Sequence, residues 1–415
     1  MKNKEIKQVS LVMVGISGMG YYYVKTLLEE FSPDLIKIQA AVDPYPEKSE
    51  LYQELKDQKI PVFPSLSEFY KKGINADLAI ISSPIHFHVP QTCEALLNGS
   101  YVICEKPLGA TIQEAEKLIH TRDAVGRWVM IGYQWSFSEA IRALKRDIGK
   151  GLLGKPIRLK TLCFWQRDEN YYRRSGWAGK IKDKKGNWIL DSPANNAMAH
   201  FLHNLFYVLG ERADTSARPA EVTAELYRAF PIENYDSTAC RVFTEDGTEL
   251  LFYASHSAIK DMGPIFSFEF EQATVDYGEF TDVIIMDDNH GNVKNYGSPE
   301  ADHHFKKLFE AVAGVRNPKP VLCGPEAASS QTLCINGMQE SAPDIVDFPE
   351  SMIHRVEETG KLWVKGLDKA FYDCYKKGIL PSEASFPWAH CGKKIDLRNY
   401  RYFPGGTPPE EGKES

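Results

Sequence analysis

Short apolar runs alternate with amphipathic segments through the first 150 residues, and this alternation restricts the fold to one class. The run Val9–Val14 is apolar at almost every position, which is typical of a strand covered on both faces. An amphipathic segment with helical spacing follows it. Strands that alternate with helices indicate a parallel, doubly wound sheet. We therefore predict an N-terminal α/β domain with later strands at residues 36–42, 77–81, 101–104 and near Val129.

A glycine-rich turn, residues 15–20, follows the first strand directly. In dinucleotide-binding domains such a turn brings the backbone close to the pyrophosphate. Asp43 stands 23 residues after Gly20, at the end of the second strand, where a carboxylate bonds the adenosine ribose and repels a 2′-phosphate. The pattern predicts NAD, with NADP less favoured, and a tight turn without a ligand is the alternative. The predicted cofactor contacts here are Gly15, Ser17, Gly18, Met19, Gly20 and Asp43.

The next two strands end in polar residues that suit the reactive end of a dinucleotide. Ligands of open α/β sheets bind at the carboxyl ends of the strands. A lysine desolvated there, beside a positively charged nicotinamide, has a lowered pKa and can take the proton of a sugar hydroxyl. We predict Lys106 as this base, and a solvated surface lysine is the alternative. The predicted cofactor contacts of these strand ends are Ser83, Pro84, His88, Glu105 and Lys106.

Residues 191–210 carry a second polar cluster on a segment that we predict to be one helix. Ser192 or Asp191 can serve as its N-cap, and Gly210 ends it. Asn196, His200 and His203 share one edge with two further polar residues. The predicted substrate contacts are therefore Asn196, His200 and His203, and a set of satisfied buried polar groups is the alternative. We predict no metal, because the acid expected beside the histidine pair is absent.

The segment before this helix is dense in aromatic and guanidinium groups. Trp165 and Arg167 lead a run that continues to Trp177. Aromatic rings can stack against a sugar, and guanidinium groups can bond its hydroxyls. We predict that Trp165 and Arg167 contact the substrate together with Lys106. A plain surface loop is the alternative for each of them.

In their order and spacing these motifs resemble the glucose–fructose oxidoreductase/inositol dehydrogenase family, also called Gfo/Idh/MocA. The resemblance extends over residues 8–345. The elements that carry it are the glycine turn, Pro84 with His88, Glu105-Lys106-Pro107, Gly132-Tyr133-Gln134-Trp135 with Phe137, residues 151–156, and the segment from Asn196 to His200.

The resemblance implies that Lys106 and His200 form the catalytic pair and that Gln134 contacts the cofactor. It also implies a C-terminal α/β domain with a large, open, mixed and mainly antiparallel sheet, which often mediates oligomerisation. The chain departs from the family at the second cluster. The family usually has Asp-x-x-x-His-x-x-Asp, whereas this chain has Asn196 and His203 at the two acidic positions.

Composition and length set the remaining expectations. A net charge of −7 gives a nucleic-acid partner no electrostatic basis, and no apolar run approaches the ~18 residues of a membrane span. Eight scattered cysteines without a CxxC pair indicate a reducing, cytoplasmic setting. We predict a Rossmann domain at 1–130, a substrate and oligomerisation domain at 131–345, and an extension at 346–415. We expect the extension to pack back on the body, with a disordered tail from Gly405 and an aromatic segment, 386–390, over a pocket or a neighbouring subunit.

These observations together predict an NAD(P)-dependent oxidoreductase. It would transfer hydride between the cofactor and a hydroxyl-bearing carbon of a sugar, sugar derivative or polyol, as a homodimer or homotetramer. One alternative is a redox-elimination glycosidase, in which retained NAD transiently oxidises the sugar. The other is a non-catalytic regulator that binds NAD and a sugar, although the intact Lys106 and His200 argue against it.

Overall fold

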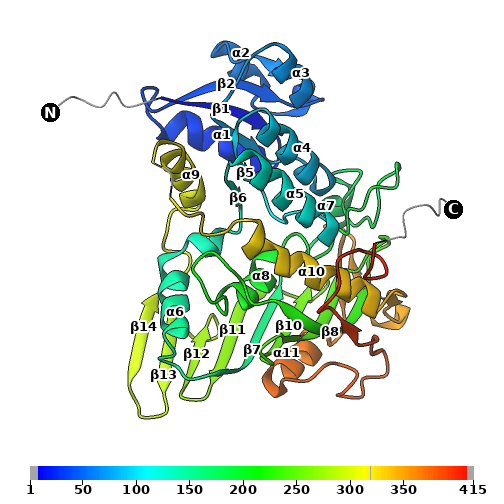
Figure 1. Cartoon of the computed structure of the whole chain (residues 1–415). Coiled ribbons are helices and arrows are strands. Elements are labelled where there is room, and N and C mark those ends of the chain that lie inside the picture. The colour runs from blue at the N-terminus through cyan, green and yellow to red at the C-terminus, as the bar shows by residue number, and fades with distance from the viewer. Residues whose placement is uncertain (1–7, 318, 409–415) are drawn as a thin grey trace.

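A computed structural model describes residues 8–317 and 319–408. Its N-terminal part holds a six-stranded parallel sheet in the order β3-β2-β1-β4-β5-β6 (Figure 1). The strands are β1 (Val9–Val14), β2 (Ile36–Val42), β3 (Val62–Phe63), β4 (Leu78–Ile81), β5 (Tyr101–Cys104) and β6 (Val129–Ile131). The order reverses between β1 and β4, where dinucleotides bind in this architecture. The predicted Rossmann sheet is confirmed.

Helices connect these strands, and their ends follow local sequence signals. At the start of α5, Glu114 accepts a hydrogen bond from the Thr111 backbone at 2.9 Å, which completes a capping box. Gly126, in the left-handed region, ends the same helix. The helices are α1 (Met19–Glu30), α2 (Tyr52–Asp57), α3 (Leu66–Lys71), α4 (Ile85–Leu97) and α5 (Ile112–Val125), with the short 3-10 turn η1 (Pro46–Lys48).

The second sheet is large and mixed, as predicted. Its order is β14-β13-β12-β11-β7-β10-β9-β8-β15, and β18 pairs with β8. Only the pairs β7–β10 and β8–β15 are parallel. The strands are β7 (Pro156–Phe164), β8 (Pro219–Arg228), β9 (Ser237–Thr244), β10 (Glu249–Ser255), β11 (Met262–Phe270), β12 (Ala273–Tyr277), β13 (Ile284–Asp288), β14 (Val293–Gly297), β15 (Val346–Asp347) and β18 (Ile395–Asp396).

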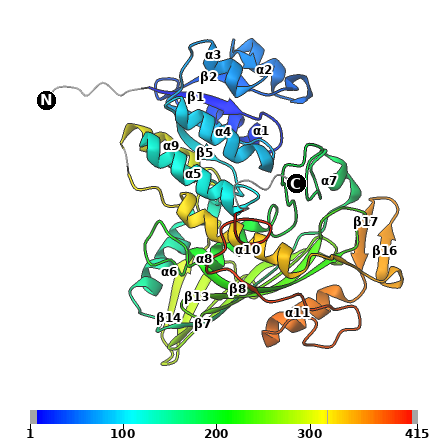
Figure 2. The ribbon, with the colours of Figure 1, turned by 45° about the vertical axis from the view of Figure 1, so that its right-hand side comes forward.

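A layer of helices lies between the large sheet and the Rossmann domain (Figures 1 and 2). α10 (Pro325–Ser341) contacts α5 on one side and β8 on the other, which explains why it is buried along most of its length. A Cβ atom on Gly337 would lie 2.5 Å from Val222, so only glycine permits this approach to β8. The other elements of the layer are η2 (Gln134–Phe137), α6 (Glu139–Gly149), α8 (Ala199–Tyr207) and α9 (Lys306–Arg316), and α7 (Glu169–Arg173) lies at its margin.

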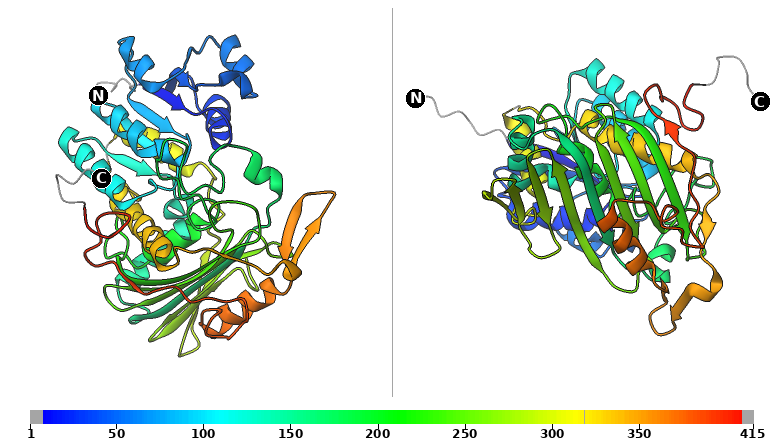
Figure 3. Two further views of the ribbon diagram at one scale, coloured as in Figure 1. Left: turned by 90° about the vertical axis from the view of Figure 1, so that its right-hand side faces the viewer. Right: turned by 90° about the horizontal axis from the view of Figure 1, so that it is seen from below.

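Much of the C-terminal extension, including α11, lies on the opposite face of the large sheet (Figure 3), whereas its end returns to α10 and α5. α11 (Leu367–Lys377) packs on β7 and β10. In the segment 386–390, Trp388 packs against Tyr227 and Phe348, so this segment covers the sheet. A hairpin of β16 (Ile353–Val356) and β17 (Lys361–Val364) follows the 3-10 turn η3 (Glu350–Met352). The Gly405 amide donates to Glu340, and residues 409–415 of the expected disordered tail lie outside the described residues.

No helix within residues 8–317 and 319–408 has both the length and the apolar character needed to span a bilayer.

Candidate active site

The glycine turn joins β1 to α1 at the point where the strand order reverses. A Cβ atom on Gly15 would lie 2.7 Å from the Ser82 carbonyl oxygen, and one on Gly20 would lie 2.0 Å from the Gly15 oxygen. Gly18 has a φ of +57° and no protein atom within 4 Å of its Cβ position. The turn is therefore packed tightly against β4 and α1 but open at Gly18, which fits a pyrophosphate that approaches the start of a helix.

Asp43 is fixed beside this turn. Its carboxylate accepts hydrogen bonds from the backbone amides of Tyr45 at 2.9 Å and Ile16 at 3.2 Å. The second bond ties the end of β2 to the glycine turn. Each carboxylate oxygen keeps a lone pair for a further donor. These free acceptor positions on Asp43 therefore fit the hydroxyls of an adenosine ribose.

His88 joins the ends of β4 and β5. It is buried in α4, with ring nitrogens 2.7 Å from the Pro107 oxygen and 2.8 Å from the Ser83 oxygen. The Ser83 hydroxyl donates to Gln91, and Pro84 caps α4. His88 thus holds the two loops at a fixed separation, which is a positioning role for the predicted cofactor contacts.

Glu105 and Lys106 have different partners although they are neighbours. The Lys307 ammonium of α9 and the Tyr23 hydroxyl of α1 donate to Glu105 Oε1 at 2.5 and 2.7 Å. Burial alone would raise the pKa of Glu105, but the charges of Lys307 and Lys106 outweigh it and hold this pKa at about 2. Glu105 is therefore an ionised, buried carboxylate whose main partner is Lys307.

The Lys106 ammonium lies across the interface between the two domains. It donates to the backbone oxygen of Asn196 at 2.7 Å and to the side-chain oxygen of the same residue at 3.2 Å. Burial lowers the pKa of Lys106 to about 8, although the charge of Glu105 acts in the opposite direction. A lysine with this pKa has a substantial neutral fraction near pH 8 and can exchange a proton there.

The second cluster differs from its prediction, because α8 begins at Ala199 rather than near Asp191. Polar side chains before it bond locally: the Asn195 amide donates to the Leu190 oxygen, and the Asn196 amide donates to the Asp191 carboxylate at 2.8 Å. Asparagine and aspartate compete with helical bonds in this way. Residues 192–198 consequently form turns.

Asp191 is a buried acid at the centre of this region. Its second oxygen accepts a hydrogen bond from the Gly179 amide at 2.6 Å. Burial raises the pKa of Asp191, and that bond and the charge of Arg174 oppose the shift. Lys106, Asn196 and Asp191 therefore form one chain of hydrogen bonds, in which Asn196 separates the amine from the carboxylate.

His200 lies in the first turn of α8, next to the Lys106 chain. Its Nδ1 atom is buried and has no hydrogen-bond partner among the described residues. Burial holds the pKa of His200 well below its usual value, and the charge of Lys106 contributes to the shift. His200 is thus a neutral imidazole with an unused ring nitrogen beside a lysine, which suits contact with a substrate hydroxyl.

His203 occupies a different environment. It stacks on Tyr133 at 3.9 Å, and its Nε2 lies 3.0 Å from the Ser136 hydroxyl and 3.7 Å from the Cys323 sulfur. Burial lowers the pKa of His203 to about 3. These contacts support a packing role for His203 in the core against η2. Gln134, in the same turn, donates to Glu300 at 3.3 Å.

Aromatic and basic residues form the wall of the site on the large-sheet side. Trp165 packs edge-on against Phe201, the residue after His200, at 5.2 Å. Arg167 lies over the Tyr171 ring at 4.9 Å, and its backbone amide donates to the His256 oxygen. α7, which contains Tyr171, lies between the Rossmann domain and the large sheet (Figures 2 and 3). Trp165 therefore lies against the first turn of α8, and Arg167 lies beside it over Tyr171.

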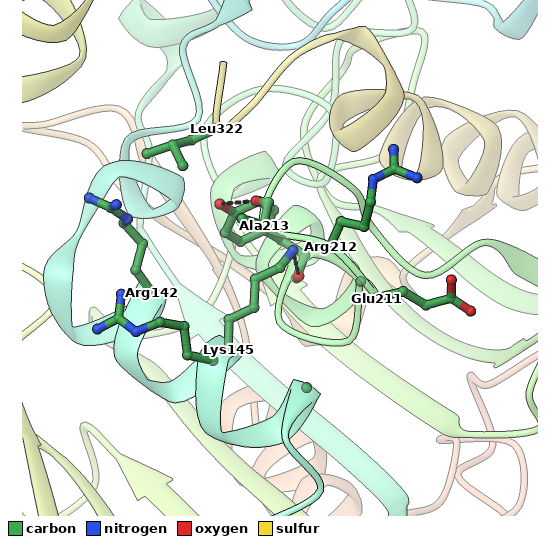
Figure 4. A pocket seen from close by; sticks show the side chains of 10 residues that line it. Arg142, Lys145, Glu211, Arg212, Ala213 and Leu322 are labelled. Carbon is green, nitrogen blue, oxygen red and sulfur yellow. Dashed lines mark hydrogen bonds between the residues drawn. The ribbon is translucent and has the colours of Figure 1, made fainter. Parts of the chain in front are cut away.

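A separate cavity of about 260 Å³ lies at the opposite end of α8 (Figure 4). Arg142 and Lys145 of α6, Arg212, Ala213 and Leu322 are among its lining residues. The Lys145 ammonium donates at 2.5 Å to the Tyr207 oxygen, at the C-terminal end of α8, and at 2.5 Å to the Thr215 oxygen in the loop that follows. Within the described residues, no group of three or more histidine, cysteine or acidic side chains could hold a metal ion.

Three residues of the site were absent from the prediction. The sequence predicts only a capping role for Asp191 and predicts no role for Lys307 or Arg174. Lys307 lies 202 residues after Glu105, and only the tertiary fold brings it to the carboxylate. The available signal for Lys307 was one lysine on the otherwise apolar edge of a helix that includes Leu308, Ala311 and Val312.

Residues 9–133 match the model of an oxidoreductase family with an NAD-binding Rossmann fold, Gfo/Idh/MocA. The rhizopine catabolism protein MocA of Rhizobium meliloti is 29% identical over 170 residues, which cover 40% of this chain and 50% of that protein. The scyllo-inositol 2-dehydrogenase (NAD(+)) of Bacillus subtilis is 29% identical over 154 residues, 37% of this chain and 44% of that protein.

A third relative is named as a hydratase. The 2,7-anhydro-N-acetylneuraminate hydratase of Mediterraneibacter gnavus is 25% identical over 183 residues, 44% of this chain and 46% of that protein. The chain thus matches half or less of the length of these relatives. Among solved structures, the WlbA dehydrogenase of Bordetella pertussis in complex with NADH and UDP-GlcNAcA is similar in fold. It has a TM-score of 0.66 and 18% identity, over 81% of this chain and 97% of that one.

Proposed function

We propose that this chain, whose residues 9–133 match the Gfo/Idh/MocA family of oxidoreductases, transfers hydride between NAD and a hydroxyl-bearing carbon of a sugar, sugar derivative or polyol. One observation carries this proposal. The Lys106 amine, at the end of β5 where a nicotinamide is expected, is hydrogen-bonded to Asn196 and lies near His200, whose Nδ1 has no hydrogen-bond partner among the described residues. A base and a neutral imidazole at this edge of the sheet suit the oxidation of an alcohol.

Gly15, Gly18 and Asp43 would hold the dinucleotide, with the pyrophosphate at the start of α1. NAD, when bound, supplies the acceptor for the hydride. The Asp43 carboxylate at the ribose position favours NAD over NADP, because a 2′-phosphate would meet its negative charge. His88, which bonds the Ser83 and Pro107 loops, would hold both loops in place beside the cofactor.

Lys106 would remove the proton of the substrate hydroxyl. In its neutral form the Lys106 amine has a free lone pair. The two Asn196 oxygens, which accept hydrogen bonds from the amine, orient it. A positioned general base of this kind contributes about 10²- to 10⁴-fold to a rate. His200 would hold the same hydroxyl through its unused ring nitrogen, and Asn196 and Asp191 would stabilise the ammonium that forms on Lys106.

A panel of sugars and polyols, assayed for NADH formation by absorbance, tests the proposal. We expect steady NADH production from at least one member of the panel. Lys106→Ala should lose about 10²- to 10⁴-fold in kcat/KM, whereas Lys72→Ala, which changes an exposed lysine of the same domain, should keep it. Full activity of Lys106→Ala would remove the assigned base.

Redox-assisted elimination is a second candidate, and two observations favour it. One of the relatives is a hydratase, and the usual acids of the family cluster are replaced by Asn196 and His203. In this chemistry the sugar is oxidised, a neighbouring group is eliminated, and the hydride returns to the sugar. The same panel extended to anhydrosugars and aryl glycosides separates the two, because elimination gives product without net NADH.

A further inference from the structure

Two arginines in the wall of the site share one aromatic ring. The Arg174 guanidinium lies 3.6 Å from the centre of the Tyr171 ring, and the Arg167 guanidinium lies 4.9 Å from the same centre. Arg167 also lies 5.9 Å from the Trp165 ring, and Arg174 lies 5.3 Å from the Trp177 ring. Both charges are therefore held by aromatic faces within one small region.

Neither of these guanidinium groups has a carboxylate within 4.0 Å among residues 8–317 and 319–408. The Arg167 Nε atom is buried without a hydrogen-bond partner in that part of the chain. Arg173, the neighbour of Arg174, behaves in the usual way: its side chain is 74% exposed and pairs with Glu169 at 2.7 Å. Arg174 is exposed as Arg173 is, and Arg167 is half-buried, so the two stacked arginines differ from Arg173 in their ring contacts and in their lack of an ion pair among the described residues.

Their position relative to the reacting groups is also defined. Trp165, under Arg167, packs against the residue that follows His200. The charge of Arg174 acts on both Lys106 and Asp191, since it lowers the pKa of Lys106 and opposes the rise in that of Asp191. The pair therefore lies near Lys106, Asp191 and the start of α8.

The local charge is unbalanced. Asp191 is the acid that faces Arg174, but its oxygens already accept hydrogen bonds from Gly179 and Asn196. Glu105 is paired with Lys307, so Asp191 is the acid that remains near Lys106 and Arg174, and neither guanidinium forms an ion pair with it among the described residues. The Nη1 atom of each guanidinium donates to a backbone oxygen, that of Gln166 for Arg167 and that of Tyr171 for Arg174. Stacking occupies the faces of each guanidinium, and its remaining edge N–H groups can bind a carboxylate or a phosphate.

We infer that the substrate bears a negatively charged group, a carboxylate or a phosphate, and that Arg167 and Arg174 bind it while its hydroxyl meets Lys106 and His200. This inference rests on the proposed function and specifies its substrate class. A neutral sugar would leave both guanidinium groups without a counter-charge. The anionic group would compensate them, and the ring of the same substrate would lie against Trp165 or Tyr171.

Matched pairs of sugars test the inference with the full chain and NAD. The pairs are glucuronate against glucose, galacturonate against galactose, and glucose 6-phosphate against glucose. The two uronate pairs test recognition of a carboxylate, and the third pair tests recognition of a phosphate. We expect kcat/KM for one acidic class to exceed that of its neutral partner by about 10- to 100-fold, as for hydrogen bonds to charged groups. Arg174→Ala and Arg167→Ala should each remove most of this preference, and Arg173→Ala should keep it.

Three results would overturn the inference: equal use of acidic and neutral sugars, a preference that survives in both arginine variants, or equal losses on both classes of substrate. Oxidation of neutral sugars alone would overturn it while leaving the proposed function intact. If no sugar yields NADH, the test is a calorimetric measurement of how the same acidic sugars bind to the protein loaded with NADH. Binding that depends on Arg174 would support the inference and contradict the function, and no binding would contradict both. Unchanged melting temperatures and NAD affinity exclude misfolded variants.

Discussion

The Lys307 ammonium donates to the Glu105 carboxylate at 2.5 Å, while the ammonium of the adjacent Lys106 donates to Asn196. The side chains of Lys307 and Glu105 are 3% and 7% exposed. This buried pair neutralises the acid beside the proposed base. Lys106 therefore keeps a lowered pKa, and its amine points to the second domain instead of being held by its neighbour.

Replacement of Lys307 should destabilise the protein strongly. Lys307→Met leaves Glu105 buried without its main partner, and the loss of one member of a buried pair costs about 3–5 kcal/mol. Urea denaturation should show this decrease in the free energy of unfolding. Lys306→Met is the matched control, because the adjacent lysine pairs with Asp302 nearer the surface and should cost at most about 1 kcal/mol. Equal losses in the two variants would contradict the assigned role of the Glu105–Lys307 pair.

The pH dependence of kcat/KM should change when Asp191 is replaced. Its negative charge raises the pKa of Lys106, so Asp191→Asn should lower that pKa further. The base is active when deprotonated, and the midpoint of the rise in kcat/KM with pH should therefore move to a lower pH. The substitution also leaves either the Gly179 or the Asn196 amide without its acceptor, which costs about 1–3 kcal/mol in stability. A midpoint that stays in place or moves to higher pH would show that Asp191 does not act on Lys106.

The glycine turn offers a test of the cofactor site that is separate from chemistry. A Cβ atom at Gly18 meets no protein atom but fills the open side of the turn, so Gly18→Ala should bind NAD at least about tenfold more weakly. The φ of +57° is strained for alanine, so the variant should also lose about 1–3 kcal/mol of stability. Gly20→Ala should instead destabilise the fold, because its Cβ atom would lie 2.0 Å from the Gly15 oxygen. Calorimetry with NAD and thermal melting distinguish the two. Unchanged NAD affinity in Gly18→Ala would argue against a dinucleotide at this turn.

Local patterns predicted the Rossmann sheet well, because strand burial and the glycine turn are encoded within a few residues. Val9–Val14 and Ile36–Val42 are strands with the expected bounds. β3, with only Val62 and Phe63, is too short to produce a periodic signal. The start of α8 was missed because Asn195 and Asn196 bond their neighbours, and propensity and apolar spacing do not register that competition.

The candidate site was only partly accessible from sequence. Lys106 could be found because it ends a buried strand next to a predicted nucleotide turn, and a motif at a strand end has a defined position in this architecture. The partners that set its chemistry come from elsewhere in the chain. Lys307 reaches Glu105 from α9, and Asp191 reaches Lys106 through Asn196. Such contacts depend on how two domains pack, which no local pattern encodes.

The proposed base is tested most directly by the pH dependence of kcat/KM for NADH formation in the wild type and in Lys106→Gln. With a Lys106 pKa of about 8, kcat/KM for alcohol oxidation should fall tenfold per pH unit below pH 8 and level off above it. Lys106→Gln should lose about 10²- to 10⁴-fold and should no longer show this titration. If the variant kept the wild-type rate and the same midpoint, Lys106 would not be the group that takes the proton.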